Sequence, residues 1–528
     1  MTAYQKMVMR DTDSNDAATG RSSRGGGRPA ALRRATVPLP AGFGIVFDAE
    51  TQFVGADVLF GGSPPRLLRL NAAGVRALGE LRGGGEVRSA EGGRLARRLT
   101  DTGLAHPRPP AAPAPGPGEV TVVIPVRDRP ADLGRCLSAL GTGYPVIVVD
   151  DGSRDPETIA SLCRRRGARV CRREICGGPG PARNDGLAMV TTPLVAFLDS
   201  DCVAGPGWIA ALAGHFADPM VGAVAPRVRP ATGPGTAGRY LDARAPIDLG
   251  PRETRVAPLT RLAYVPTAAL LARRDAVAAG FDPGLRYGED VDLVWRMAAA
   301  GWRVRYDPGA QVRHTEPGGW APVLARRFRY GSSAAPLARR HPGQVPPLVL
   351  QAWPAAAAAA LLARRPLTAL AAYGAGTGQL IRLLREWGVP ARSVLRPMAG
   401  SVYQTWLGGG RWSIQYALPL VAAGLARPGG RTGRARLGRR LALASLLLGP
   451  PAAEWLRSRP RLDPVRFTLG YLADEAAYGA GVYRGALAER LVGPLLPRIA
   501  WRPLPKRRPA GPAPRESGEP AVCGGRWM

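Results

Sequence analysis

The chain has 528 residues, 45% of them hydrophobic, and a formal net charge of +32. This length accommodates about two to four domains with a sizeable core, and six cysteines without a C-x-x-C pair predict neither a disulfide framework nor a zinc site. The basic residues are spread along the whole chain and do not form one stripe with interleaved aromatic residues, which argues against nucleic acid as a partner. An anionic membrane surface stays a predicted partner.

Low-complexity stretches divide the chain. Residues 1–34 and 502–528 have little to bury and are predicted to be disordered. Residues 108–118, PRPPAAPAPGP, predict a stiff linker and a domain boundary. The N-terminus has no apolar core of the kind that a secretory signal needs, so we expect a reducing, cytosolic environment.

Residues 35–107 predict a small module that precedes the linker. The segments 44–47 and 57–60 indicate a β-hairpin or meander. Asn71 can cap a helix, and Gly103 can end a later one. Strands followed by short helices suggest a winged-helix-like α+β unit. Such a unit can bind an extended peptide at a strand edge, or it can be a packing appendage without a ligand.

Two apolar runs, 146–149 and 194–198, predict buried strands of a sheet covered on both faces. Paired acids follow each run: Asp150 and Asp151 after the first, Asp199 and Asp201 after the second. Ligands of open α/β sheets lie beyond the carboxyl ends of the strands, and hard divalent cations prefer oxygen ligands. The two turns together therefore predict a nucleotide-phosphate site, although each alone is also typical of solvated turns.

Further elements complete a predicted domain over residues 119–330. A glycine-rich loop before a helix, GGPGPARN at 177–184, can face an anion. Residues 229–258 predict a long loop near the site. Gly288-Glu289-Asp290 predicts the start of a helix, and 304–306 and 311–314 predict two short strands.

The motifs VVIPVRDR, VVDDGS, GGPGPARNDGL, FLDSD and GEDVDLVWR follow one another in the order typical of inverting family-2 nucleotide-sugar glycosyltransferases, which the chain resembles. The resemblance covers about residues 119–330 and implies a GT-A fold, a Rossmann-like mixed sheet with helices on both faces. Within the family the chain looks most like the glycosyltransferases of the mycofactocin system. The N-terminal module, PVRDR and the segment RRFRYGSSAAPLARRHPG carry that closer likeness.

The resemblance implies roles for the acidic residues. Asp201 and Asp199 would hold Mg²⁺ or Mn²⁺ at the diphosphate, with His314 as a third ligand or as a structural side chain. Asp151 would lie near the base or ribose. The complete predicted set for nucleotide-sugar binding is Pro125, Arg127, Asp150, Asp151, Arg183 and Asp199.

Inversion also requires a carboxylate on the acceptor side of the sugar. The resemblance implies Asp290 as this general base, with Glu289 as the second candidate. The structural alternative is that both are helix-start acids, and Arg183 has a comparable alternative as a surface helix residue. The segment 326–330 predicts a basic surface turn or, alternatively, a flap that closes over the diphosphate.

Residues 331–501 predict a mainly helical, apolar region. Val345 to Ala363 is uncharged and near the length of a bilayer span, and the alternatives are interfacial helices or a soluble helical subdomain. We expect association with the cytoplasmic face of the cell membrane.

The resemblance implies transfer of a hexose from a nucleoside diphosphate sugar, UDP-glucose being the expected donor, to the peptide-derived redox cofactor mycofactocin. One alternative is a membrane-associated family-2 enzyme acting on a lipid or polysaccharide. An alternative of another class is a basic protein that binds nucleic acid or an anionic surface.

Overall fold

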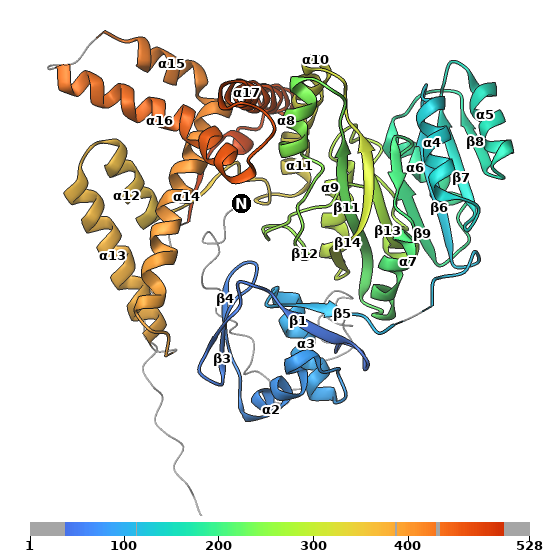
Figure 1. Cartoon of the computed structure of the whole chain (residues 1–528), viewed down its shortest axis with the longest axis horizontal. Helices are drawn as coiled ribbons and strands as arrows, with labels where there is room; N and C mark the ends of the chain where they lie inside the picture. The colour runs from blue at the N-terminus through green and yellow to red at the C-terminus, as the bar shows by residue number, and fades with distance from the viewer. Residues whose placement is uncertain (1–36, 112, 386–387, 429–432, 501–528) are drawn as a thin grey trace, which may run out of the picture.

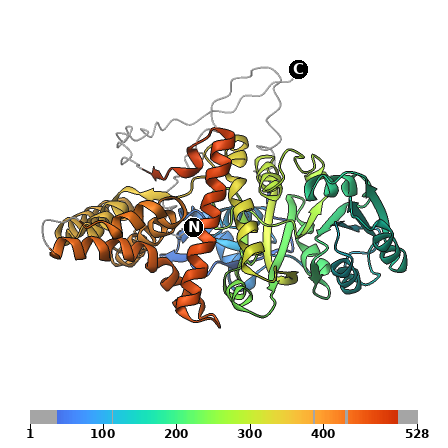
Figure 2. The same ribbon diagram turned by 90° about the horizontal axis from the view of Figure 1, so that it is seen from above.

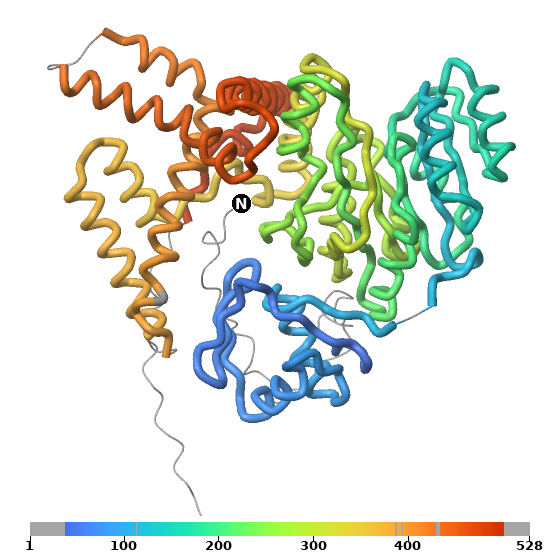
Figure 3. Tube along the Cα trace, in the orientation of Figure 1, coloured from blue at the N-terminus to red at the C-terminus, as the bar shows by residue number. Residues whose placement is uncertain are grey.

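The computed structural model describes residues 37–111, 113–385, 388–428 and 433–500. The predicted disordered segments 1–34 and 502–528 lie outside these residues. Figures 1 and 3 show a sheet domain flanked by helices, with the N-terminal module below it and the C-terminal helical region to its left.

A mixed sheet forms the centre of the molecule and confirms the predicted fold class. Its spatial order is β10 (Cys202–Ala204), β14 (Arg303–Thr315), β11 (Val221–Ala231), β13 (Ala269–Arg273), β9 (Leu194–Leu198), β6 (Val120–Val126), β7 (Val146–Asp151) and β8 (Arg169–Arg173), and β12 (Thr254–Val256) pairs with β14. Strands β9, β6, β7 and β8 are parallel, and β13 runs antiparallel to β9 and β11. The carboxyl ends of β9, β6 and β7 therefore meet at one edge.

Helices cover both faces of this sheet because its strands are apolar on both sides. One face carries α4 (Pro130–Leu140), α5 (Pro156–Arg165) and α7 (Trp208–Ala213). The other carries α6 (Pro179–Ala188) and α9 (Glu289–Ala299).

Two expectations for the end of the domain are wrong. The predicted loop 229–258 contains the end of β11, helix α8 (Thr236–Arg244) and β12. The two short strands predicted at 304–306 and 311–314 form the single strand β14. A register shift against β11 accommodates the Pro308-Gly309 pair between them.

The N-terminal module contains β1 (Gly44–Phe47), β2 (Gln52–Val54), β3 (Val58–Gly61), β4 (Arg66–Arg69), α2 (Ala72–Leu81), α3 (Ala90–Thr102) and β5 (Ala105–Arg108). The two predicted strand segments lie in different sheets: β1 pairs with β5, whereas β3 lies between β2 and β4 in a meander. Asn71 caps α2 by accepting from the Gly74 amide at 2.9 Å, and Gly103 ends α3 at φ 73°. The likeness to a winged helix stays a prediction.

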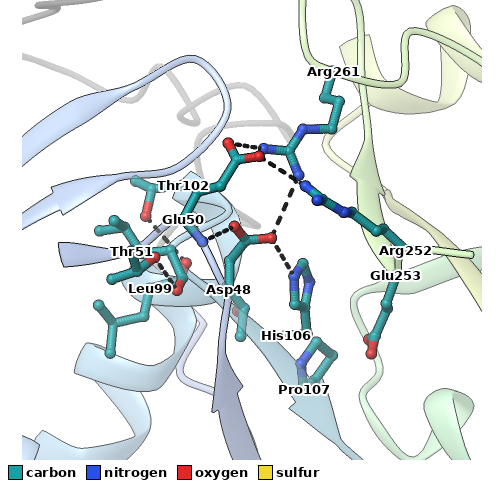
Figure 4. A network of polar contacts seen from close by, with 12 residues as sticks. Asp48, Glu50, Thr51, Leu99, Thr102, His106, Pro107, Arg252, Glu253 and Arg261 are labelled. Carbon is teal, nitrogen blue, oxygen red and sulfur yellow. Dashed lines mark hydrogen bonds and ion pairs between the residues drawn. The ribbon is translucent and has the colours of Figure 1, made fainter. Parts of the chain in front are cut away.

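Ion pairs fasten this module to the sheet domain. The buried Arg97 guanidinium donates to both carboxylate oxygens of Asp218 at 2.7 and 2.8 Å. Figure 4 shows a second contact, in which Arg261 reaches Glu50 at 2.6 Å and Asp48 at 3.5 Å. Burial opposes ionisation of Asp48, but its hydrogen bond with His106 and the charge of Arg261 outweigh burial and lower its pKa to about 2.

The C-terminal region begins with α10 (Trp320–Ser332) and α11 (Ala334–Arg340), so the predicted turn at 326–330 is a helix. It continues with β15 (Val349–Gln351), α12 (Ala352–Leu362), α13 (Pro366–Arg385), α14 (Arg392–Tyr416), α15 (Leu418–Ala426), α16 (Gly433–Ser458), α17 (Pro464–Glu489) and β16 (Arg498–Ala500). Figure 2 shows several of these helices extending away from the sheet domain.

The apolar run Val345 to Ala363 does not form one helix. A strand occupies 349–351 and an eleven-residue helix 352–362. None of the helices in the described ranges has both the length and the hydropathy to cross a membrane.

Close packing joins α17 to α10. A Cβ at Gly481 would lie 1.9 Å from the Phe328 carbonyl oxygen, so the two backbones approach where only glycine fits. Arg327 on α10 and Arg244 on α8 both pair with the buried Asp474, at 2.6 and 2.5 Å. The helical region thereby holds α10 against the sheet edge.

Candidate active site

The acidic turn after β9 lies at the sheet edge where the parallel strands end. Arg183 Nη2 donates to Asp199 Oδ1 at 2.5 Å, and Arg129, which follows β6, pairs with Asp201. Burial raises the pKa of Asp201, and the neighbouring charge of Asp199 adds to this effect against the opposing His314 and Arg129. A nearby cation would therefore stabilise the ionised form of Asp201.

His314 faces the same turn because the β10–β14 pairing sets Cys202 opposite it. Its Nε2 lies 3.4 Å from Asp201 Oδ1, and its Nδ1 lies 3.1 Å from Glu316 Oε1. Arg326 of α10 holds the other Glu316 oxygen. A ring whose Nδ1 is bound by a carboxylate presents Nε2 as its metal-binding atom.

These residues fit a divalent cation by the chemistry of their donors. Asp199 and Asp201 offer carboxylate oxygens, and His314 offers an oriented imidazole nitrogen. Within the ranges that the structure describes, no three His, Cys, Asp or Glu side chains converge as a ready ligand set. Arg183 and Arg129 hold the two carboxylates in this arrangement.

Arg183 connects this turn to the start of α9. Its guanidinium is 3% exposed and donates to Asp199 from one nitrogen and to Glu289 Oε1 at 3.1 Å from the other. It also lies over the Phe281 ring, 5.4 Å from the centroid. The structural reading of Arg183 as an exposed helix residue is therefore wrong, and α6 couples the two acidic turns.

Helix α9 begins with the second pair of acids. Gly288, at φ 79°, makes the turn, and a Cβ there would lie 2.9 Å from Leu337. Burial and the charge of Glu289 raise the pKa of Asp290 to about 7. Burial also raises the pKa of Glu289, against the charge of Arg183. The residue Asp290 as a whole is partly exposed, and its Oδ1 accepts from the Val291 amide at 2.8 Å.

Two tyrosines lie near Asp290; the sequence predicted Tyr330 only as part of the segment 326–330, and Tyr264 was missed. Tyr330 is 40% exposed as a whole residue, but desolvation of its hydroxyl group and the charge of Asp290 raise its pKa to about 12, against the charge of Arg326. Burial and Asp290 also raise the pKa of Tyr264. Trp295 of α9 donates to the Ala263 carbonyl at 2.8 Å, which fixes the Tyr264 segment. An aromatic residue one helical turn after Arg326 was the available signal for Tyr330.

The acids at the end of β7 have different surroundings. Asp151 accepts from the backbone amides of Gly177 and Gly178 at 2.9 and 2.8 Å, and from Arg173 at 2.8 Å. Asp150 accepts from the Ser153 amide and pairs with Arg172 at 2.6 Å. Both carboxylates are buried and bind the protein's own loops.

The remaining predicted residues border the same edge. Pro125 lies near the end of β6 and is buried. Arg127 is half exposed and donates to Cys176 Sγ at 2.8 Å. Arg183 links Asp199 to Glu289, whereas Asp201 pairs with Arg129 and lies beside His314. The turn at 199–201 brings these two groups of contacts together. Asp151 and Arg127 contact the neighbouring loop at 176–178, and Asp150 lies beside Asp151.

The chain is similar in sequence to known glycosyltransferases. Residues 121–278 match the family model described as glycosyl transferase family 2. The chain is 38% identical over 493 residues to the pre-mycofactocin glycosyltransferase of Mycobacterium tuberculosis, a match that spans 87% of this chain and 98% of that protein. It is 33% identical over 189 residues to an uncharacterized glycosyltransferase of Mycobacterium bovis, covering 35% of this chain and 81% of the relative.

Among solved structures, the chain is similar to a mannosyltransferase of Pyrobaculum calidifontis in complex with GDP-Man and Mn²⁺. The TM-score is 0.40 at 18% identity, with 71% of this chain and 91% of that chain covered.

Proposed function

The chain belongs to glycosyl transferase family 2, and from this premise we propose that it transfers a hexose from a nucleoside diphosphate sugar to a hydroxyl group of pre-mycofactocin. The match to the pre-mycofactocin glycosyltransferase over nearly its whole length supports this acceptor. We propose glucose as the sugar and UDP-glucose as the donor.

One observation carries the chemistry: Arg183 links the acids at the carboxyl end of β9 to the acids that open α9. Asp199, Asp201 and His314 would hold Mg²⁺ or Mn²⁺. The cation would act as a Lewis acid on the diphosphate. Arg127 and Pro125, with Asp150 and Asp151 behind the glycine loop, would border the nucleotide; direct contact of Asp151 with base or ribose stays a prediction.

Asp290 would act as the general base on the acceptor side. It takes the proton of the acceptor hydroxyl, whose oxygen bonds to the anomeric carbon while the bond to the diphosphate breaks. A pKa of about 7 suits this task, because the group is then a sufficient base and is substantially ionised at neutral pH. Glu289 is the second candidate, but its carboxylate is occupied by Arg183.

A panel of nucleotide sugars tests the proposal. The purified chain is incubated with each nucleotide sugar, with Mg²⁺ or Mn²⁺, and with or without pre-mycofactocin. The release of the nucleoside diphosphate is measured. We expect release that depends on the acceptor and the cation and is greatest with UDP-glucose. Glu157→Gln, a change at an exposed acid of α5, is the matched control for variants of the site. Release that ignores the acceptor would contradict this function.

The C-terminal region favours a second acceptor class, a lipid or polysaccharide at a membrane. Residues 345–453 contain thirteen arginines and one acidic residue, Glu386. Leu367 and Leu370 on α13 are 81% and 66% exposed. Basic helices with exposed apolar side chains are typical of contact with an anionic membrane surface, and we propose the cytoplasmic face of the cell membrane as the location. Co-sedimentation with vesicles that contain phosphatidylglycerol tests this contact.

A further inference from the structure

An open groove lies between helices α12, α14 and α16, in the part of the molecule that extends away from the sheet domain (Figure 1). Its volume is about 720 Å³, within the range of small-molecule sites. Side chains such as Leu361, Val402, Trp406 and Leu441 make its walls apolar. The site proposed for sugar transfer uses none of these residues.

The apolar walls continue to the surface. Leu361 is 55% exposed, Leu437 59% and Leu441 61%, although each comes from a helix that packs against its neighbours. Adjacent exposed leucines on two helices mark a binding surface more often than isolated ones do. The groove therefore offers a hydrocarbon chain a path from solvent to its interior.

Two guanidinium groups lie among these apolar residues. Arg364 and Arg434 line the groove, and its lining includes no acidic side chain among the described residues. Arg364 Nη1 donates to the Arg434 carbonyl at 3.0 Å and lies over Gly438, where a Cβ would come within 2.1 Å of it. This contact fixes one cation at the border of the apolar groove. The matching ligand has a hydrocarbon chain and an anionic head.

We propose that this groove binds the hydrocarbon chain of a membrane lipid whose phosphate headgroup has a net negative charge, and that Arg364 and Arg434 contact the phosphate. The excess of arginine over residues 345–453 gives the same charge preference for the surroundings of the groove. The proposal is independent of sugar transfer, and it differs from adhesion to a bilayer because a single lipid molecule suffices.

Isothermal titration of the full chain with lysophosphatidic acid, below the concentration at which it forms micelles, tests the site. We expect one molecule to bind per chain. Lysophosphatidylcholine of the same chain length should bind at least tenfold more weakly, because its headgroup carries no net charge. Inorganic phosphate should not compete, because most of the contact is apolar. Equal affinity for the two lipids, or competition by phosphate, would overturn the proposal.

Substitutions locate the binding site. Ala442→Trp fills the groove and should reduce affinity at least tenfold, and the pair R364Q and R434Q should remove the preference for the anionic lipid. Arg436→Gln, on α16 but outside the lining, is the control and should leave binding unchanged. Circular dichroism verifies that each variant is folded, and release of the nucleoside diphosphate verifies that the sheet domain is intact. Undiminished affinity in a folded Ala442→Trp chain would rule the groove out.

Discussion

The acidic ends of β7 and β9 have one sequence design and two chemical environments. Each is an apolar strand that ends in two carboxylates. At β7, Asp151 receives two backbone amides and an arginine, so its negative charge is bound internally. At β9, burial raises the pKa of Asp201, and its partners are side chains from other elements. The hydrogen-bond donors around a buried acid therefore indicate whether its role is structural or chemical.

The largest loss of activity should come from substitution of Asp290, the proposed general base at the start of α9. Asp290→Asn removes the proposed base and should lower kcat by about 10²- to 10⁴-fold. Calorimetry should find nucleotide-sugar binding nearly unchanged, because the asparagine keeps the shape of the side chain. Full turnover in this variant would exclude Asp290 from the proton transfer. The acids at the start of α9 would then have no chemical role to set against the acids of β7.

Asp201→Ala tests the turn after β9 itself. Loss of the proposed ligand should cost several kcal/mol of transition-state stabilisation, or about 100-fold or more in kcat/KM at limiting cation. The cation concentration needed for half-maximal activity should rise. An unchanged cation requirement would mean that the acids of β9, like those of β7, only hold the protein together.

The pH profile gives a smaller, graded effect. The base must be ionised, and the pKa of Asp290 is raised to about 7, so kcat/KM should fall about tenfold per unit as pH decreases below 7. Glu289→Gln removes a negative charge that raises the pKa of Asp290, so the break should move to lower pH. If the pH at which kcat/KM begins to fall is the same in this variant, a group other than Asp290 is responsible for the pH dependence.

The smallest effect on catalysis should come from β7. Asp151→Asn weakens a buried carboxylate that accepts two amides and an arginine, and should lower the free energy of unfolding by about 1–3 kcal/mol. Denaturant titration measures this change. If nucleotide affinity falls instead while stability is retained, Asp151 touches the ligand and the two turns are alike.

Sequence reasoning found the strands and the acids because apolar runs and their carboxyl ends are local patterns. Sequence reasoning could not identify the side chains that pair with those acids. Arg183 reaches Glu289 across 106 positions, and no local rule states which of many arginines will do so. The prediction of one helix over 345–363 failed for a related reason. Hydropathy does not reveal that residues 349–351 form β15 and pair with β16, near residue 500, so that the helix begins only at residue 352.

The ion pairs of the N-terminal module bear on how this protein can be handled. The proline-rich stretch before residue 119 invites truncation to a catalytic fragment. Such a fragment would lose the buried pair of Asp218 with Arg97 and the partly buried pair of Arg303 with Asp101, and it would expose to water the face of the sheet domain that these pairs cover. Recombinant work should therefore keep residues 37–118 attached, because this face of the sheet domain is uncovered in a shortened chain.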